Sequence, residues 1–271
     1  MQIIEIDDFK DERLELYTSY NEVELLHYFE PEAGIFIAET PVVIERAIER
    51  GAQPLSFLIE EKAFDSEPVQ QLLAGFGDEE VDVFLAPLDM INQLTGFNLT
   101  RGVLCAMRRP SMPTVEEILS SSCKIAIMED VLNPTNIGAI FRSAAALGVD
   151  GILITADSTD PFYRRAARVS MGTVFQVPWT YLPKDVDINI VLHRYGFTTV
   201  AMALKENAVP LDDSALKNHE KLAVIFGTES TGITDETIAG CDYTAIIPMS
   251  NEVDSLNVAA ASAVTFWELF K

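Results

Sequence analysis

The sequence predicts an α/β protein with two domains. Short apolar runs typical of strands alternate with helix-like segments along the 271 residues. Prolines between Arg109 and Thr114 interrupt this alternation, because each disfavours helix in the preceding residue and has no amide to donate. Downstream the apolar runs become more continuous, as in parallel strands covered on both faces. We therefore expect a smaller α/β domain over residues 1–110, a linker over 111–116 and a larger α/β domain over 117–271.

In the smaller domain, strand-like runs alternate with helix-like segments. The runs are Gly34–Ala38, Leu55–Ile59, Val81–Leu85 and Val103–Met107. Thr40 followed by Pro41 is typical of a capped helix start, and Gly51 is typical of a helix end. The spacing between them predicts a helix over Val42–Arg50.

In the larger domain, the predicted strands are more hydrophobic. They are Ile125–Met128, Gly151–Thr155, Thr198–Met202, Leu222–Phe226 and Thr244–Ile247. Between the first two, Asn136 can cap a helix from about Ile137 to Leu147 that ends at Gly148. The final stretch, Leu256–Phe270, is apolar nearly all round, so we expect a helix buried on more than one side.

The formal net charge of −23 disfavours a polyanionic partner, because long-range repulsion slows the encounter with RNA. The basic residues are nevertheless clustered. One cluster comprises Arg101, Arg108 and Arg109, and another comprises Arg142, Arg164, Arg165 and Arg168. Either these arginines form a local basic face on an acidic body, or they pair with nearby acids on the surface.

The three cysteines, Cys105, Cys123 and Cys241, are far apart and lie in or beside apolar runs. This pattern favours buried free thiols over a disulfide or a metal site, and we expect no metal. The first residues are acidic and contain no long apolar run, which argues against a secretory leader or a membrane span. A cytoplasmic protein is expected.

Two loops of the larger domain are suited to holding a ligand. Phe226–Ile233 follows an apolar strand and contains Gly227 and Gly232, which permit close backbone approach, although a tight turn fits equally well. It lacks the glycine spacing of a dinucleotide-binding loop. Ile247–Met249 ends another strand, and Ser255–Asn257 starts the last helix, where Ser255 is also a candidate for an ordinary cap. A partly apolar, partly hydrogen-bonding slot is expected there.

Three segments taken together resemble the SpoU (TrmH-like) RNA ribose methyltransferases. They are Asn133–Arg142, Phe226–Gly232 and the pair formed by Ile247–Met249 and Ser255–Val258, in the family's order. Ser170–Pro178 is similar to the segment that lies between the first two in the family. The resemblance is strong from Lys124 onward. Residues 1–110 more weakly resemble the ribosomal-protein-like RNA-binding domain of many members, through Phe36–Thr40, Val43–Ala47 and Leu94–Val103.

The resemblance implies an α/β knot, a homodimer and transfer of a methyl group from S-adenosylmethionine to a ribose 2′-hydroxyl of structured RNA. Ribosomal RNA is favoured over transfer RNA by the attached N-terminal domain. A non-catalytic RNA-binding or ribosome-assembly factor with the same fold is the main alternative, motivated by the acidic charge. A nucleotide-dependent oxidoreductase is a third hypothesis, with no motif to support it.

The resemblance also assigns roles to residues. The catalytic positions are Arg142, Asn136, Glu229, Ser255 and Asn257. The cofactor positions are Leu204, Gly227, Gly232, Ile247, Met249, Leu256 and Asn257. We expect Arg142, Arg164, Arg165 and Arg168 to contact RNA. Because a guanidinium loses its proton only above about pH 12, we favour Arg142 as an electrostatic stabiliser of the developing alkoxide, with base action left open.

Overall fold

The computed structural model describes residues 1–8, 10–76, 81–95, 102–251 and 254–271. The chain forms two compact units. Unit 1 comprises Met1–Ser111 and Phe162–Phe175, and unit 2 comprises Met112–Pro161 and Gln176–Lys271. The division near Ser111 falls at the proline-rich stretch, whereas the return of Phe162–Phe175 to unit 1 was not expected from the sequence. Residues 96–101, including Arg101 and part of Leu94–Val103, lie outside the described residues.

Unit 1 contains a mixed five-stranded sheet in the order β1-β4-β3-β5-β2. Its strands are β1 (Gln2–Glu5), β2 (Ile35–Glu39), β3 (Gln53–Glu60), β4 (Asp82–Ala86) and β5 (Val103–Arg108). The β1–β4 and β3–β4 pairs are parallel, and β5 is antiparallel to β3 and β2. The four predicted strands are confirmed. The sequence did not reveal β1, which is short and mostly exposed.

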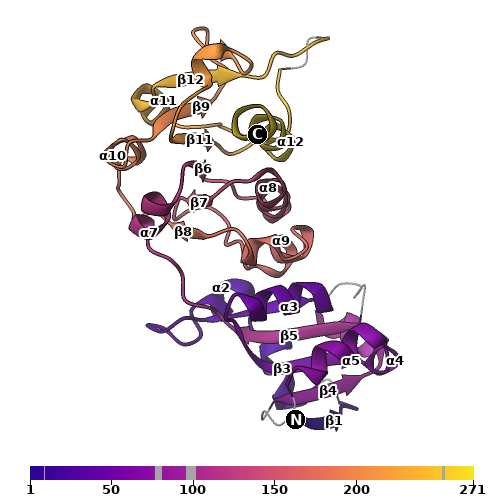
Figure 1. Ribbon diagram of the computed structural model, residues 1–271. Helices are drawn as coiled ribbons and strands as arrows, with labels where there is room; N and C mark the ends of the chain where they lie inside the picture. The colour runs from indigo at the N-terminus through magenta and orange to yellow at the C-terminus, as the bar shows by residue number, and fades with distance from the viewer. Residues whose placement is uncertain (9, 77–80, 96–101, 252–253) are drawn as a thin grey trace. The chain divides into compact units, whose positions relative to one another are not determined.

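Short helices accompany this sheet (Figure 1). They are α1 (Glu15–Thr18), α2 (Glu22–Leu26), α3 (Pro41–Glu49), α4 (Glu61–Phe64), α5 (Glu67–Ala74), α6 (Leu88–Thr95) and α9 (Arg164–Val169). Helix α3 confirms the predicted helix between Thr40 and Gly51. Thr40 precedes it with a φ of 82° and makes no capping hydrogen bond through its side chain.

The segment Phe162–Phe175 is held in unit 1 by charge and by aromatic packing. Glu39 at the end of β2 has a fully buried side chain, which pairs with Arg164 at 3.0 Å and with Arg168 at 3.2 Å. Phe162 stacks on Phe175 with ring centroids 4.7 Å apart. Both rings also contact Phe36 of β2. These contacts explain why the segment belongs with unit 1.

Unit 2 contains a seven-stranded sheet in the order β10-β12-β9-β11-β6-β7-β8, and all neighbouring strands are parallel. Its strands are β6 (Lys124–Met128), β7 (Gly151–Ile154), β8 (Trp179–Tyr181), β9 (Thr198–Met202), β10 (Val209–Pro210), β11 (Leu222–Phe226) and β12 (Tyr243–Ile246). The five predicted strands and the parallel sheet are confirmed. The edge strands β8 and β10 are too short to produce a clear apolar run.

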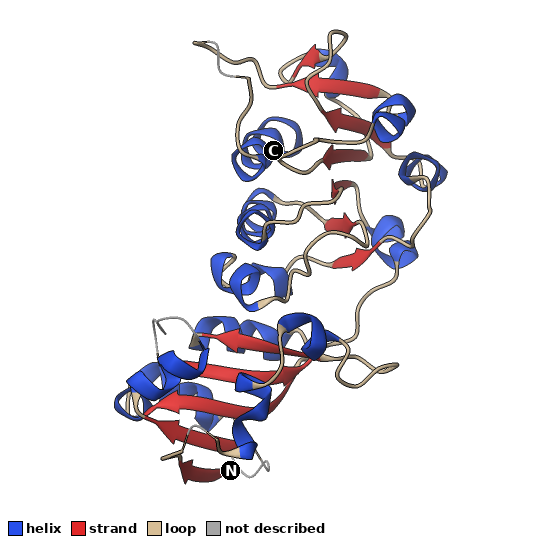
Figure 2. Ribbon diagram, turned by 180° about the vertical axis from the view of Figure 1, so that it is seen from behind, coloured by secondary structure: helices blue, strands red, loops and turns tan. Residues whose placement is uncertain are grey.

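Helices cover both faces of this sheet (Figures 1 and 2). They are α7 (Val115–Ser121), α8 (Pro134–Leu147), α10 (Ile188–Arg194), α11 (Asp235–Gly240) and α12 (Val258–Phe270). Helices α7, α10 and α11 lie on one face, and α8 and α12 lie together on the other. The apolar side chains of the central strands are buried between these layers, as expected for a parallel sheet.

Helix α8 starts three residues earlier than predicted. Asn133 is its N-cap and accepts a hydrogen bond from the backbone N–H of Thr135 at 2.9 Å. Pro134 occupies the first helical position, where a missing N–H costs nothing. The prediction that Asn136 caps this helix is therefore wrong, and its buried side chain is available for another contact. Gly148 ends the helix with a φ of 75°, as predicted.

Helix α12 is buried on one side and exposed on another. Phe266 stacks on Phe270 and meets Phe226 of β11 edge-on, with both centroid separations at 5.6 Å. The ammonium group of Lys124 donates a hydrogen bond to the carbonyl of Phe270, which fixes the end of the helix beside β6. On the outer side, Trp267 is 55% exposed. The expected burial of this apolar helix is thus incomplete within the chain.

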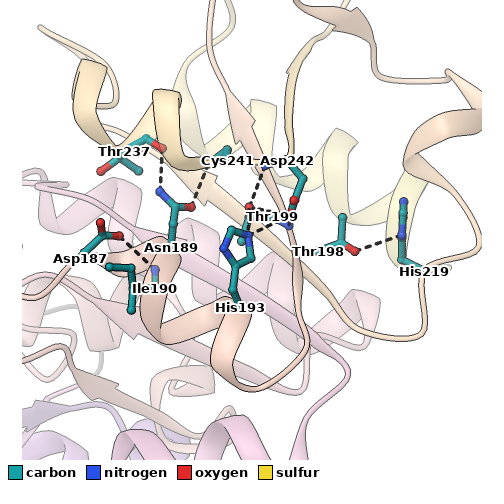
Figure 3. Close-up of polar contacts among 10 residues, drawn as sticks. All are labelled: Asp187, Asn189, Ile190, His193, Thr198, Thr199, His219, Thr237, Cys241 and Asp242. Atoms are coloured by element: carbon teal, nitrogen blue, oxygen red, sulfur yellow. Dashed lines mark hydrogen bonds and ion pairs between the residues drawn. The ribbon is translucent and has the colours of Figure 1, made fainter.

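A polar cluster joins the starts of β9 and β12 to α10 (Figure 3). The Asp242 carboxylate accepts hydrogen bonds from the Thr199 backbone N–H at 2.8 Å and from the Thr199 hydroxyl at 3.0 Å. The ring of His193 on α10 lies 3.0 Å from the same carboxylate oxygen. Beside it, the Asn189 side chain donates to the carbonyl of Thr237 at 2.8 Å. The cluster fixes the amino ends of two strands.

The cysteines are free thiols in three different environments. Cys105 is buried, and burial raises the pKa of its thiol well above the usual value. Cys241 is partly buried, and burial raises its pKa to about 11. Cys123 is exposed, so the prediction of burial is wrong for this residue. It lies between α7 and β6, where the apolar run has not yet begun.

Candidate functional site

A cavity of about 520 Å³ opens at the carboxyl ends of β9, β11 and β12. Its walls come from segments far apart in the sequence. They are Met202–Lys205, Phe226–Ile233, Ala245–Ile247 with Met249, and Asp254–Val258, together with Asp235, Ile238 and Ala261. Because the carboxyl ends of parallel strands meet at one edge of the sheet, the loops that follow them converge there.

The cavity brings together every residue that the sequence assigned to the cofactor. Leu204, Gly227, Gly232, Ile247, Met249, Leu256 and Asn257 all line it. Three of the predicted catalytic residues line it as well: Glu229, Ser255 and Asn257, the last of which was also assigned to the cofactor. The convergence of these positions is a property of the fold, whereas their binding and catalytic roles stay predictions.

The loop Gly227–Ile233 folds back on itself at the edge of the cavity. The backbone N–H of Gly232 donates to the carbonyl of Thr228 at 3.0 Å, and Gly232 has a φ of 72°. A Cβ atom at Gly227 would lie 2.2 Å from the carbonyl carbon of Gly232 and 2.3 Å from the backbone nitrogen of Ile233. Gly227 is therefore required for the loop to close. This closure agrees with the tight turn that the sequence left open, and the approach of a ligand to this backbone stays a prediction.

Glu229 is connected to helix α8 through Asn136. Asn136 lies in the first turn of α8 and is 6% exposed. Its side-chain amide donates a hydrogen bond to the Glu229 carboxylate. Since β6 and β11 are neighbours in the sheet, the loops that follow them are close enough for this contact. Asn136 does not line the cavity itself, but it orients a carboxylate that does.

Arg142 does not line the cavity. It lies on α8, is exposed, and is outside the cavity lining formed by the described residues. A carboxylate beside Arg142 would fix the direction of its guanidinium through charge-assisted hydrogen bonds. The motif carboxylate, Glu229, accepts instead from Asn136. The catalytic role of Arg142 stays a prediction.

Two of the arginines expected to contact RNA are held by an acidic residue of unit 1. Arg164 and Arg168 both pair with the buried carboxylate of Glu39. Burial lowers the pKa of Arg164, an effect partly offset by Glu39. Arg165, between them in α9, is exposed. For Arg164 and Arg168, the structure therefore favours pairing with an acidic residue over a free basic face.

The start of α12 is capped by Asn257. Its side-chain oxygen accepts a hydrogen bond from the backbone N–H of Ala259 at 2.9 Å. The alternative that Ser255 is the cap is therefore wrong. Ser255 lies two residues before the cap, is exposed and lines the cavity. The Ser255 hydroxyl therefore does not cap α12, and capping does not explain a serine at this position.

Sequence reasoning missed two charged residues in the cavity wall, Lys205 and Asp235. They form an ion pair at 2.7 Å, and the hydrogen bond from Lys205 lowers the pKa of Asp235. Lys205 follows the predicted residue Leu204, and Asp235 opens α11, so their positions after strand ends offered a weak signal. With Glu229 and Asp254, acidic groups exceed basic groups in the cavity lining.

Within the described residues, no helix has both the length and the hydrophobicity needed to cross a membrane. The same part of the chain contains no group of three or more histidine, cysteine or acidic side chains arranged to hold a metal ion.

Comparison with known proteins gives consistent matches. Residues 124–267 match the SpoU rRNA methylase family. A tRNA/rRNA methyltransferase of Mycobacterium tuberculosis, itself uncharacterized, is 32% identical over 269 residues, covering 99% of this chain and 92% of its own. A 23S rRNA (guanosine-2′-O-)-methyltransferase of Acinetobacter baylyi is 25% identical over 231 residues, covering 83% of this chain and 92% of its own.

Solved structures share the fold over nearly the whole chain. The AdoMet-bound rRNA methyltransferase from Sinorhizobium meliloti superposes with a TM-score of 0.80 at 22% identity, covering 99% of this chain and 97% of its own. The family match spans more than half of the 271 residues and contains every segment that lines the cavity. This chain therefore belongs to the SpoU rRNA methylase family.

Proposed function

We propose that this protein transfers a methyl group from S-adenosylmethionine to a ribose 2′-hydroxyl of ribosomal RNA. The observation that carries the proposal is the convergence of loops after β9, β11 and β12, with the start of α12, around one cavity in a member of the SpoU family. A relative that aligns with 83% of the chain is a 23S rRNA (guanosine-2′-O-)-methyltransferase.

The cavity suits S-adenosylmethionine in size and chemistry. A volume of about 520 Å³ is within the range of small-molecule sites. Ile238, Ile247 and Leu256 supply apolar surface for an adenine ring, and the neighbouring loops supply backbone hydrogen-bonding groups. The excess of acidic over basic side chains in the lining favours a ligand with net positive charge. S-adenosylmethionine supplies a methyl group on a positively charged sulfonium.

The chain has two tasks in this reaction: alignment of the ribose hydroxyl with the donor, and stabilisation of charge as the hydroxyl loses its proton. Asn136 holds Glu229 at the cavity edge, where the carboxylate can direct a hydroxyl or a cationic group. Ser255 presents a hydroxyl at the same cavity. Arg142 contributes a permanent positive charge that stabilises the developing alkoxide or aligns a phosphate.

We further propose that the active form is a homodimer that pairs through α12 and α8. On α12, Ala260, Val264 and Trp267 follow a helical spacing and are exposed. Val264 is 41% exposed and Trp267 is 55% exposed. Adjacent exposed apolar side chains on one helix face are typical of a surface that is covered by a partner. Pairing through this face would cover them and would leave Arg142 on α8 beside the subunit boundary. Sedimentation of wild type against Trp267→Glu tests this assembly.

The knotted path implied by the family resemblance is also a proposal. It is supported by the return of the chain from β12, beyond β9 and β11, to pack α12 against α8. A ribosomal RNA substrate would place the protein in the cytoplasm, which cell fractionation tests.

The first test is calorimetric titration with S-adenosylmethionine, followed by transfer of a labelled methyl group to ribosomal and transfer RNA transcripts. Binding and transfer to ribosomal RNA are expected. Binding of RNA without binding of S-adenosylmethionine would favour the assembly-factor hypothesis, and binding of a nicotinamide cofactor would favour the oxidoreductase. Mapping of ribose methylation in cells that lack the protein would identify the nucleotide.

A further inference from the structure

We propose that Glu129 is a positioning residue for the cofactor-binding loop Gly227–Ile233. This inference deepens the proposed function and depends on it for the identity of the cofactor. Glu129 directly follows β6 and is not part of the cavity lining. It acts on the loop through hydrogen bonds at both of the loop's ends.

At the start of the loop, the backbone N–H of Glu129 donates to the carbonyl of Phe226 at 2.8 Å. At the end of the loop, the Glu129 carboxylate accepts from the backbone N–H of Thr234 at 2.8 Å. One residue therefore fixes the two points between which the loop folds back. The loop's internal closure, from Gly232 to Thr228, then sets the position of the backbone that lines the cavity.

The environment of Glu129 is unusual for a carboxylate. The residue is 4% exposed, and its second oxygen, Oε2, is buried with no hydrogen-bond partner among the described residues. Burying a charged oxygen without a donor is unfavourable, so a residue selected for stability alone would rarely be a glutamate here. A glutamate at the site edge, beside β11, is explained if the loop requires the bond from Thr234.

The geometry predicts different cofactor affinities for two substitutions of Glu129. Glu129→Ala removes the acceptor for Thr234 and releases one end of the loop. Glu129→Gln retains a carbonyl oxygen that can accept the same bond and removes the buried charge. We expect the alanine variant to bind S-adenosylmethionine at least about tenfold more weakly, and the glutamine variant to bind within about threefold of wild type. The glutamine variant should unfold at the same temperature as wild type or a higher one.

Thr234 permits the same test from the donor side. Its φ of −62° is compatible with proline, so Thr234→Pro removes the N–H with little change in φ. Thr234→Ala removes the side chain that caps α11 and keeps the N–H, and is the matched control. The proline variant should lose at least about tenfold more affinity than the alanine control. Glu117→Ala, which also removes a carboxylate that accepts a backbone N–H, is the control at α7 and should bind normally.

Unchanged affinity in folded Glu129→Ala would overturn the proposal, as would equal loss in the alanine and glutamine variants. If Glu129→Ala does not fold, the comparison of Thr234→Pro with Thr234→Ala decides, and equal affinities reject the inference. Hydrogen exchange of the Thr234 and Gly232 amides without ligand separates this idea from the proposed function. Faster exchange in Glu129→Ala, restored in Glu129→Gln, is expected even if wild type binds no S-adenosylmethionine, and unchanged exchange would reject the positioning role.

Discussion

Asn136 donates a hydrogen bond to Glu229 across 93 positions of sequence. The bond joins the first turn of α8 to the loop after β11. It therefore connects two sequence motifs whose contact in space could not be deduced from the sequence. Because Asn136 is buried and Glu229 is exposed, the amide is the fixed partner and the carboxylate is the one being oriented.

Asn136→Ala should reduce methyl transfer by about 10- to 100-fold, because a hydrogen bond to a charged group is worth about 1.5–3 kcal/mol. Glu229→Ala should have a similar effect. The double variant should be little worse than either single variant, since both remove one interaction. Steady-state kinetics on a ribosomal RNA transcript measures this, and strictly additive losses would show that the two residues act independently.

Arg142→Ala should lower kcat by about a hundredfold or more while S-adenosylmethionine affinity stays close to that of wild type. The reason is that Arg142 lies outside the cavity lining and is assigned to charge stabilisation at the ribose. Single-turnover kinetics and calorimetry on the same sample measure the two effects. Substantial activity in this variant would remove Arg142 from the mechanism.

Gly227→Val should abolish measurable S-adenosylmethionine binding, because the added carbons collide with the backbone of Gly232 and Ile233 and force the loop open. Gly196→Ala is a suitable control, since a Cβ there meets nothing within 4 Å although the φ is 79°. It should cost about 1 kcal/mol of stability and leave binding unchanged. Calorimetry would contradict the loop-closure argument if Gly227→Val bound normally.

The stability of unit 2 should fall in acid partly through Asp242. Burial raises the pKa of Asp242. Hydrogen bonds from Thr199 and His193 lower it by a larger amount, so the pKa in the folded protein is below the usual 3.8. The stabilisation from this carboxylate is complete above the unfolded pKa and is lost as pH falls through the lower folded pKa. Asp242→Asn should therefore unfold with a shallower dependence on pH below about pH 4. Urea unfolding at several pH values measures the free energy of unfolding of both proteins. If its slope against pH were the same in wild type and Asp242→Asn, Asp242 would not be involved.

Cysteine labelling should follow exposure. In the native protein iodoacetamide at mild alkaline pH should modify Cys123 first, Cys241 slowly and Cys105 only after unfolding, because Cys105 is buried and the pKa values of Cys105 and Cys241 are raised. Mass spectrometry of timed samples identifies the order. Early modification of Cys105 would contradict its position in the core.

The apolar runs were sufficient to predict nine strands and the parallel sheet, because continuous hydrophobic segments such as Leu222–Phe226 have few alternatives to a buried strand. The start of α8 was misplaced because Asn133 and Asn136 are both good caps by type. Only Pro134 distinguishes them. Short edge strands such as Trp179–Tyr181 give too few residues for a period to be recognised.

Contacts between segments that are far apart in the chain could not be predicted from the sequence. The pairing of Glu39 with Arg164 and Arg168, and the bond from Thr234 to Glu129, depend on which loops meet in space. No local propensity encodes them. The positions of the cavity residues were identified through family resemblance, and the structure adds a reason for one of them: a Cβ at Gly227 would collide with the backbone of Gly232 and Ile233.

The order in which the chain is synthesised has a consequence for this cavity. Its wall includes Asp254–Val258 and the first turn of α12, which a ribosome makes after every strand of both sheets. A nascent chain arrested before this point would have a largely complete sheet but no closed pocket. We therefore expect that the methyl donor binds only after translation has reached the first turn of α12, and that products truncated before Asp254 are inactive.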